Sequence, residues 1–527
     1  MTKTLALAEK LNTNSFEFPE KIAIIWKDER VTYKEINDRA TKIANALISM
    51  GLQKGDNVSV ILRNVPEYIT IICGLVKAGM VHVPINWRFA PAEVEYVINN
   101  SKSKAIVFAE EFLEKIIPIN DNLPNIPKSN FLFIGDNLPD GMKKYEDIIT
   151  SASDEEIQVE IHDKDPYFIG YTSGTTGRPK GAVTRHGLWE FKVAALPMLL
   201  RLEATPEEVQ LLTMPLFHMN AINTTGLSIY LGHTVVLMPG RFSGEDVLKM
   251  MQEHKCTFSS MVPTMYHRIK ELTDEIKNKY DTSSMKSILQ SSAPLPYSTK
   301  EWIVGFFKSA GLFEAYGGTE AGIATVLYPE EQLTKKNSVG RAVPTTELMI
   351  VDDDGHELPI GEVGQIISRP ASTDTPIPPV TEYYKDTDST KKSFREGWFY
   401  SGDMGYLDEE GYLYLVDRKF DMIISGGENI YPKEIEDVLY TNPKVLDAAA
   451  VGIPDKEWGE SVKAVLVLKK GETATEKEMI DFCREPLGKY KTPTSVDFTD
   501  ELPKTATGKV LRRIVKEKYW KDQERRI

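Results

Sequence analysis

The feature that most constrains the fold of this chain is an alternation of short apolar runs with helix-like segments. Thr32 and Glu35 form a capping box that opens a helix with apolar residues at helical spacing. We expect further helices at Pro66–Ala78, Pro91–Asn99 and Gly244–His254. We expect strands at Lys21–Trp26, Asn57–Leu62, Val81–Ile85, Lys104–Phe108, Thr234–Met238, Thr257–Val262 and Lys286–Gln290. This order predicts an α/β fold of mostly parallel sheets with helices on their faces.

A second, smaller unit is expected after about Asp417, where the pattern changes. Helices are predicted at Glu434–Leu439 and from a capping box at Thr475 through Cys483, and strands at Ala448–Val451 and Val462–Leu468. The remaining stretch of about 110 residues is large enough to fold as a domain. We therefore predict a large N-terminal domain at 1–417 and a small α+β domain at 418–527.

Composition narrows the classes of function. The net charge of −14 argues against general nucleic-acid binding, which needs a basic surface. The three cysteines are scattered and odd in number, which favours neither a disulfide framework nor a zinc site and indicates a reducing cytoplasm. No run approaches the roughly 20 apolar residues of a membrane helix, and peripheral membrane contact stays open.

One segment rich in glycine and hydroxyl groups, Tyr171–Gly181, predicts a phosphate-binding loop. Glycines allow close approach of the backbone to a ligand, while hydroxyls and cations bind phosphate oxygens. The segment is not a Walker A loop, because Lys180 precedes Gly181 rather than Ser or Thr. A flexible surface loop is the alternative. The apolar runs on both sides favour a loop between two strands. Its candidate ligand-binding residues are Thr172, Ser173, Gly174, Thr175, Thr176, Gly177 and Lys180.

Four other segments follow in order: Tyr316–Glu320, Tyr400–Asp403, Asp417–Asn429 and Pro503–Lys509. Each alone is compatible with an ordinary turn. With the loop, they resemble the motif set of AMP-forming acyl-CoA synthetases, in the adenylate-forming superfamily, from about Tyr33 to Arg513. The resemblance implies a mobile small domain over the active site. It also implies two half-reactions: a carboxylic acid and ATP give acyl-AMP and pyrophosphate, and coenzyme A then displaces AMP.

The resemblance also implies an ATP site. The Thr172–Lys180 loop is expected at the β- and γ-phosphates, and Thr319 at the α-phosphate. Glu320, together with Thr172, is expected to hold Mg²⁺, which favours hard oxygen ligands. Lys509 matches the catalytic lysine that bridges the carboxylate and the α-phosphate.

The nucleoside contacts are implied in the same way. Tyr316 resembles the residue beside adenine, with Ser292, Ala293 and Pro294 on its other side. Asp403 matches the carboxylate that binds the ribose hydroxyls, and Arg418 is similar to its cationic partner.

The acid-binding region is expected at Met214–Asn220, which resembles the motif bordering the acyl pocket. His218 is either a wall of this pocket or a packed core histidine. Relatives that activate amino acids usually carry Asp at this position, so His218 argues against an α-amino-acid substrate. The apolar residues that follow indicate a fatty or aryl acid.

Two positions concern the small domain. Gly427 resembles the wall of the pantetheine passage, although a tight turn explains the neighbouring Gly426 equally well. Phe420 replaces the usual Asp or Lys of the domain pivot. The rival acceptor is a carrier protein's phosphopantetheine thiol, and the rival function is a non-catalytic AMP-binding scaffold. Because Lys509 and Glu320 are both present, a catalytically decayed scaffold is disfavoured.

Overall fold

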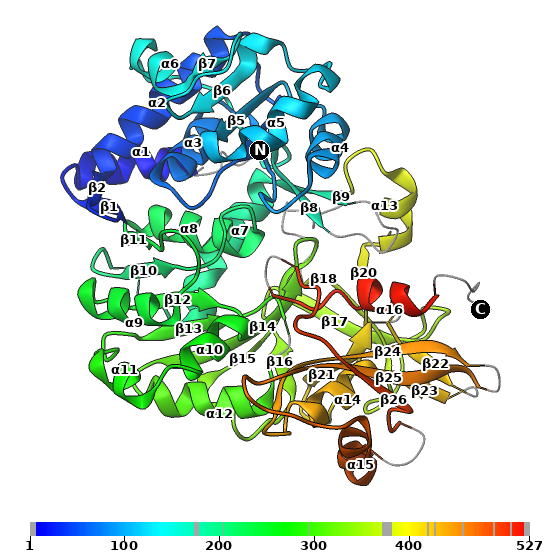
Figure 1. Ribbon diagram of the computed structural model, residues 1–527. Coiled ribbons are helices and arrows are strands. Elements are labelled where there is room, and N and C mark those ends of the chain that lie inside the picture. The colour runs from blue at the N-terminus through cyan, green and yellow to red at the C-terminus, as the bar shows by residue number, and fades with distance from the viewer. Residues whose placement is uncertain are drawn as a thin grey trace.

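The computed structural model describes residues 7–172, 179–203, 205–293, 295–371, 382–418, 421–425, 428–455, 458–487, 491–505 and 508–520. At 188–194, 417–418, 428–429 and 485 it describes the backbone alone. The described strands form three sheets, coloured from blue to red along the chain in Figure 1.

The first sheet has seven strands in the order β7-β6-β5-β3-β4-β8-β9. All neighbours are parallel except β8 and β9. The strands are β3 (Asn57–Ile61), β4 (Val81–Pro84), β5 (Ala105–Ala109), β6 (Phe131–Ile134), β7 (Lys143–Lys144), β8 (Pro166–Thr172) and β9 (Lys180–Arg185).

The second sheet has fourteen strands, and one half of it is parallel. This half contains β1 (Ile22–Trp26), β10 (Val209–Leu212), β11 (Thr234–Leu237), β12 (Phe258–Met261), β13 (Ser287–Gln290) and β14 (Gly311–Gly318). Strand β2 (Glu29–Thr32) pairs antiparallel with β1 at the edge. The expected parallel arrangement is confirmed here.

The other half of this sheet is antiparallel, which corrects the expectation of mostly parallel strands. It contains β15 (Gly322–Leu327), β16 (Ser338–Ala342), β17 (Thr346–Val351), β18 (Gly364–Pro370), β19 (Phe394–Arg395), β20 (Trp398–Leu407) and β21 (Tyr412–Arg418). The physical reason is the length of the connections. Parallel neighbours need a long crossover, whereas β14–β15 and β20–β21 are joined by short turns.

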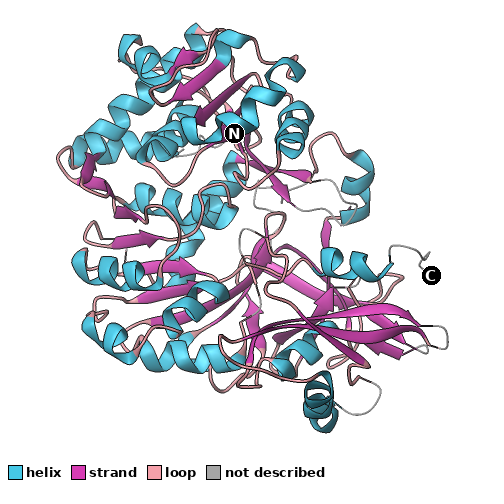
Figure 2. Ribbon diagram, viewed as in Figure 1, coloured by secondary structure: helices cyan, strands magenta, loops and turns pink. Residues whose placement is uncertain are grey.

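Helices cover the two sheets and fill the space between them (Figure 2). They are α1 (Leu7–Glu17), α2 (Tyr33–Ser49), α3 (Pro66–Lys77), α4 (Pro91–Ser101), α5 (Leu113–Ile116), α6 (Tyr145–Ser151), α7 (His186–Leu200), α8 (Met219–Leu231), α9 (Gly244–Glu253), α10 (Pro263–Lys270), α11 (Asp274–Lys279), α12 (Tyr297–Phe306) and α13 (Thr387–Ser393). None of the described helices has the length and apolar character that crossing a membrane requires.

Helix α2 illustrates why these residues form these elements. Both hydrogen bonds of the predicted capping box are present, so the prediction is confirmed. The apolar positions of α2, including Ile36 and Ile43, are buried in a core shared with α3 and α8. This core holds the two sheets together.

The described residues of the small domain form a five-stranded sheet with three helices. Its elements are β22 (Ile423–Ser425), β23 (Glu428–Ile430), β24 (Val445–Asp455), β25 (Gly459–Leu468), β26 (Ser495–Phe498), α14 (Pro432–Leu439), α15 (Glu476–Leu487) and α16 (Arg512–Trp520). The predicted fold class, a large domain of sheets and helices with a small α+β domain, is confirmed. The boundary at 417 stays a prediction, and β21 ends at Arg418.

Candidate functional site

Several of the candidate residues lie at one edge of the large sheet, where its parallel strands end. His218 follows β10, Ala293 follows β13, and Thr319 follows β14. The carboxyl ends of parallel strands meet at the same edge of a sheet, and ligands of α/β proteins commonly bind there. The fold thus gathers at one edge residues that lie about a hundred positions apart in the sequence.

The two predicted metal residues, Thr172 and Glu320, meet between the seven-stranded and the fourteen-stranded sheet. Thr172 ends β8 and pairs in register with Lys180 of β9. The Thr172 hydroxyl donates a hydrogen bond of 3.4 Å to Glu320. The turn that carries Glu320 requires glycine at 317, because a Cβ there would lie 1.8 Å from the Gly322 carbonyl oxygen. The predicted contacts at Ser173, Gly174, Thr175, Thr176 and Gly177 lie outside the described residues.

Tyr383 completes this group, and sequence reasoning missed it. Its hydroxyl donates to the same Glu320 oxygen at 3.0 Å. The segment that carries Tyr383 pairs with β9 through Ala182, and Lys180 Nζ lies 5.4 Å from the centre of the Tyr383 ring. Burial and the nearby Glu320 raise the pKa of Tyr383 above its usual range, so its hydroxyl stays a donor.

The side-chain oxygen atoms of this group are suitable ligands for a magnesium ion. Glu320 offers a carboxylate, and Thr172 offers a hydroxyl beside it. Both side chains are half-buried, so they are accessible to a ligand. Mg²⁺ prefers hard oxygen ligands and usually shares them with phosphate groups.

Two of the predicted nucleoside residues, Tyr316 and Asp403, are in contact. The Tyr316 hydroxyl donates to Asp403 Oδ2 at 2.8 Å. Asp403 is the register partner of Arg418 across β20 and β21, while the Arg418 side chain lies outside the described part. On the other side, Gln290 Nε2 donates to the Ala293 carbonyl at 2.5 Å and holds that loop. Pro294 is not among the described residues.

His218 is the N-cap of α8, at the start of the predicted acyl region. Its ring lies 4.5 Å, centre to centre, from the ring of Phe217. Burial, and then the charge of Arg88, lower the pKa of His218 to about 4. The imidazole is therefore neutral near pH 7. Buried Ala221, Ile222 and Leu227 follow on α8, as an apolar pocket would require.

Lys509 belongs to a tight hairpin of the small domain that reaches the same edge. Lys504 and Val510 pair as an antiparallel bridge, and Thr505 N–H donates to the Lys509 carbonyl at 2.7 Å. Arg88 of the large domain donates to the Thr505 carbonyl at 3.4 Å. The hairpin is thus next to the residue whose charge acts on His218. Gly426, Gly427 and Phe420 lie outside the described part of the chain, so their predicted roles are untouched.

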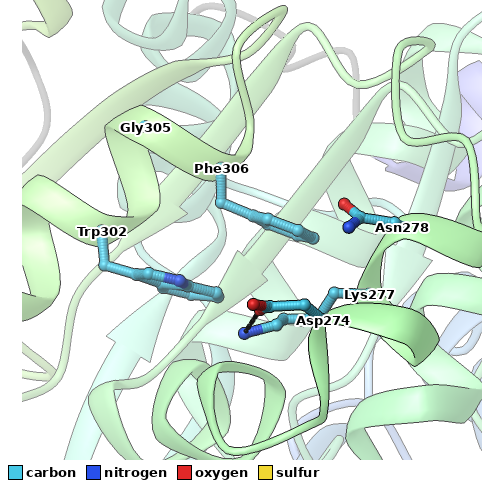
Figure 3. Close-up of a pocket in the computed structure, with 6 residues that line it drawn as sticks. All are labelled: Asp274, Lys277, Asn278, Trp302, Gly305 and Phe306. Atoms are coloured by element: carbon cyan, nitrogen blue, oxygen red, sulfur yellow. Dashed lines mark ion pairs between the residues drawn. The ribbon is translucent and has the colours of Figure 1, made fainter.

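An open cavity of about 240 Å³ lies elsewhere, between α11 and α12 (Figure 3). Trp302 and Phe306 stack on its wall with ring centres 5.1 Å apart, and Asp274 pairs with Lys277 at 3.0 Å. None of the predicted site residues lines this cavity. The stacking is explained by the spacing of the two aromatic residues on one helix face.

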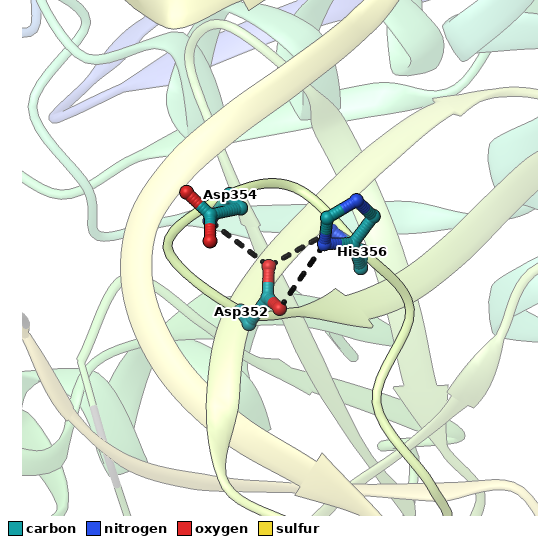
Figure 4. A group of neighbouring side chains, drawn as sticks. All are labelled: Asp352, Asp354 and His356. Atoms are coloured by element: carbon teal, nitrogen blue, oxygen red, sulfur yellow. Dashed lines mark hydrogen bonds and ion pairs between the residues drawn. The ribbon is translucent and has the colours of Figure 1, made fainter.

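A second cluster, Asp352, Asp354 and His356, lies in an exposed turn after β17 (Figure 4). Asp352 Oδ1 accepts the backbone N–H groups of Asp354 and His356, each at 2.9 Å. Asp408 accepts the corresponding N–H groups, of Glu410 and Tyr412, in the β20–β21 turn. Asp352 is therefore explained as a turn cap, and the predicted metal residues remain Glu320 and Thr172.

Comparison with known proteins identifies the family of the chain. The family model described as AMP-binding enzyme matches residues 11–373, and the AMP-binding enzyme C-terminal domain matches residues 434–509. The chain belongs to the AMP-binding enzyme family. The predicted reaction class, an AMP-forming acyl-CoA ligase, is confirmed, and with it the resemblance inferred from the motifs.

The relatives span almost the whole chain. A long-chain-fatty-acid–CoA ligase of Mycobacterium tuberculosis is 33% identical, covering 93% of this chain and 94% of its own. An anthranilate CoA ligase solved with anthranoyl-AMP has a TM-score of 0.87 and 27% identity, covering 98% and 97%. O-succinylbenzoate coenzyme A synthetase from Bacillus subtilis, solved with ATP and magnesium, has a TM-score of 0.83 and 30% identity, covering 96% and 98%.

Proposed function

We propose that this family member activates a fatty or aryl carboxylic acid with Mg²⁺-ATP and transfers the acyl group to free coenzyme A. The observation that carries the proposal is the meeting of Thr172, Glu320 and Tyr383 beside the strand ends that hold Thr319 and Ala293. Hydroxyl and carboxylate oxygens at such an edge suit a nucleotide with its metal. The relatives that act on fatty and aromatic acids support this substrate class.

The residues are assigned as follows in this proposal. Glu320 and Thr172 hold Mg²⁺, which when bound offsets the charge of the ATP phosphates. Thr319 and Lys180 contact phosphate oxygens, Tyr316 and Ala293 flank adenine, and Asp403 binds the ribose hydroxyls with Arg418. Lys509 lies between the acid and the α-phosphate and stabilises the charge that develops there. His218 is a neutral wall of the acid pocket, and Gly427 lines the passage for pantetheine.

A cytoplasmic location is part of the proposal. Cys73, Cys256 and Cys483 are all buried and free, as suits a reducing compartment.

The test measures both half-reactions on Lys509→Ala. A pyrophosphate-release screen over short, long and aryl acids first identifies a substrate of the unaltered enzyme. Loss of one preorganised donor typically lowers the rate about 10²- to 10³-fold. We expect that loss in acyl-AMP formation, whereas supplied acyl-AMP and coenzyme A should still give acyl-CoA. Equal loss in both steps contradicts the assignment of Lys509, and no pyrophosphate with any acid contradicts the function.

A further inference from the structure

Helix α10, which follows β12, contacts the hairpin that carries Lys509. A Cβ built on Gly508 would lie 2.5 Å from Thr264 Oγ1 and 2.8 Å from Thr264 Cγ2. Gly508 also has a φ of +82°, a conformation that favours glycine. The α-carbon of Gly508 therefore packs directly on the side chain of Thr264, and a side chain at position 508 would collide with Thr264.

Hydrogen bonds tie both Gly508 and Lys509 to Thr505, so a shift of Gly508 is passed on to Lys509. Gly508 N–H donates to the Thr505 carbonyl at 2.9 Å, and Lys509 N–H donates to Thr505 Oγ1 at 3.0 Å. At its base, Lys504 forms an ion pair with Asp447 of β24. A side chain that displaced Gly508 would therefore also displace Lys509.

From these contacts we propose that Thr264 is a positioning residue for acyl-AMP formation. Gly508 packs against it, and this contact sets the distance of Lys509 from the reacting groups. Thr264 acts only through the hairpin. Because the contact joins the two domains, it exists only while the small domain is docked on α10. The inference rests on the proposed role of Lys509, and the experiment below separates the failure of one from the failure of the other.

The main test compares Thr264→Leu with Thr264→Ser. Misplacement of a catalytic group by about 1 Å costs roughly 10²-fold in rate. We expect Thr264→Leu to lower acyl-AMP formation by about that factor and to leave thioester formation from supplied acyl-AMP unchanged. Thr264→Ser keeps Oγ1 and should form acyl-AMP at nearly the unaltered rate. In the Lys509→Ala background, Thr264→Leu should cause no further loss.

A second readout does not depend on activity. Lys504 and Lys509 are trypsin sites, and we expect docking on α10 to slow cleavage there. Thr264→Leu should then speed cleavage in the hairpin, while Thr264→Ser should not. Thermal unfolding of the three proteins checks that each is folded. If cleavage follows this pattern while Lys509→Ala forms acyl-AMP normally, the docking contact of Thr264 is supported and the proposed catalytic role of Lys509 is contradicted.

The following results would overturn the proposal. Equal loss of both half-reactions in folded Thr264→Leu indicates a general structural defect. A raised KM for the acid with unchanged kcat indicates that Thr264 lines the acid pocket instead. Unchanged acyl-AMP formation and unchanged cleavage mean that Thr264 does not seat the hairpin.

Discussion

The hydroxyl of Tyr383 is the contact at the candidate metal site that most invites a test. It donates to Glu320 at 3.0 Å, and the Tyr383 side chain is only 9% exposed. Tyr383→Phe removes this donor and changes little else. A hydrogen bond to a charged group contributes about 1.5–3 kcal/mol. With tenfold per about 1.4 kcal/mol, the Mg²⁺ affinity should fall about 10- to 150-fold.

The assay is pyrophosphate release as a function of Mg²⁺ concentration at saturating ATP and acid. Tyr383→Phe should shift the Mg²⁺ midpoint upward by that factor, and saturating Mg²⁺ should restore most of kcat. The range agrees with the roughly 10- to 100-fold loss typical when a partner of a metal ligand is removed. The matched control is Tyr384→Phe, since that neighbouring hydroxyl accepts from Asn57 instead. An unchanged Mg²⁺ midpoint in Tyr383→Phe, or the same shift in both variants, refutes the reasoning.

Two further predictions concern stability and pH. Lys300 and Glu314 form an ion pair at 2.7 Å, and their side chains are only 2% and 6% exposed. Because Lys300→Met leaves the buried Glu314 without its partner, this variant should lower the free energy of unfolding, measured in urea, by about 3–5 kcal/mol. Lys300→Met with Glu314→Gln should recover part of this loss, and a loss below about 1 kcal/mol contradicts a buried charge. With the small domain docked on α10, burial and then the charge of Lys270 lower the pKa of His267 to about 4. The other charged groups that act on His267 are Asp447, Lys504 and Lys469. The docked state thus binds fewer protons, so docking is favoured above pH about 6.5 and weakens as pH falls towards 4. The rate of acyl-AMP formation should therefore fall as the pH is lowered from about 6.5 towards 4. In His267→Gln this fall should be smaller, and a fall of the same size in this variant contradicts the prediction.

Local patterns predicted the elements of the fold well because their causes are local. The capping box at Thr32 and the buried face of α2 follow from spacing alone, and the structure has both. The antiparallel half of the large sheet was not predicted, since short turns such as 319–321 between strands carry little hydrophobic periodicity. In the parallel half, strands β11, β12 and β13 and the helix α9 were predicted from their apolar spacing, whereas β10 and β14 were not.

The candidate site was predicted only where motifs are contiguous. Thr319 and Glu320 lie in one recognisable string, whereas Tyr383 is 63 residues beyond Glu320 and follows a stretch of sequence at 370–379 that is rich in Pro, Thr and Ser. Nothing local indicates that Tyr383 returns to β9. Arg88 and Thr264 were missed for the same reason, because their contacts with the hairpin join segments hundreds of residues apart.

The contact between Thr172 and Glu320 has a consequence for how the molecule comes apart. Thr172 ends a strand of the seven-stranded sheet, and Glu320 follows a strand of the fourteen-stranded sheet. A nucleotide bound by both residues would therefore connect the seven-stranded sheet to the fourteen-stranded sheet. By mass action, ligand at about a hundred times its Kd adds roughly 2.7 kcal/mol to the folded state. An enzyme starved of ATP would therefore be expected to loosen first along this seam, where hydrogen exchange would detect the earliest opening.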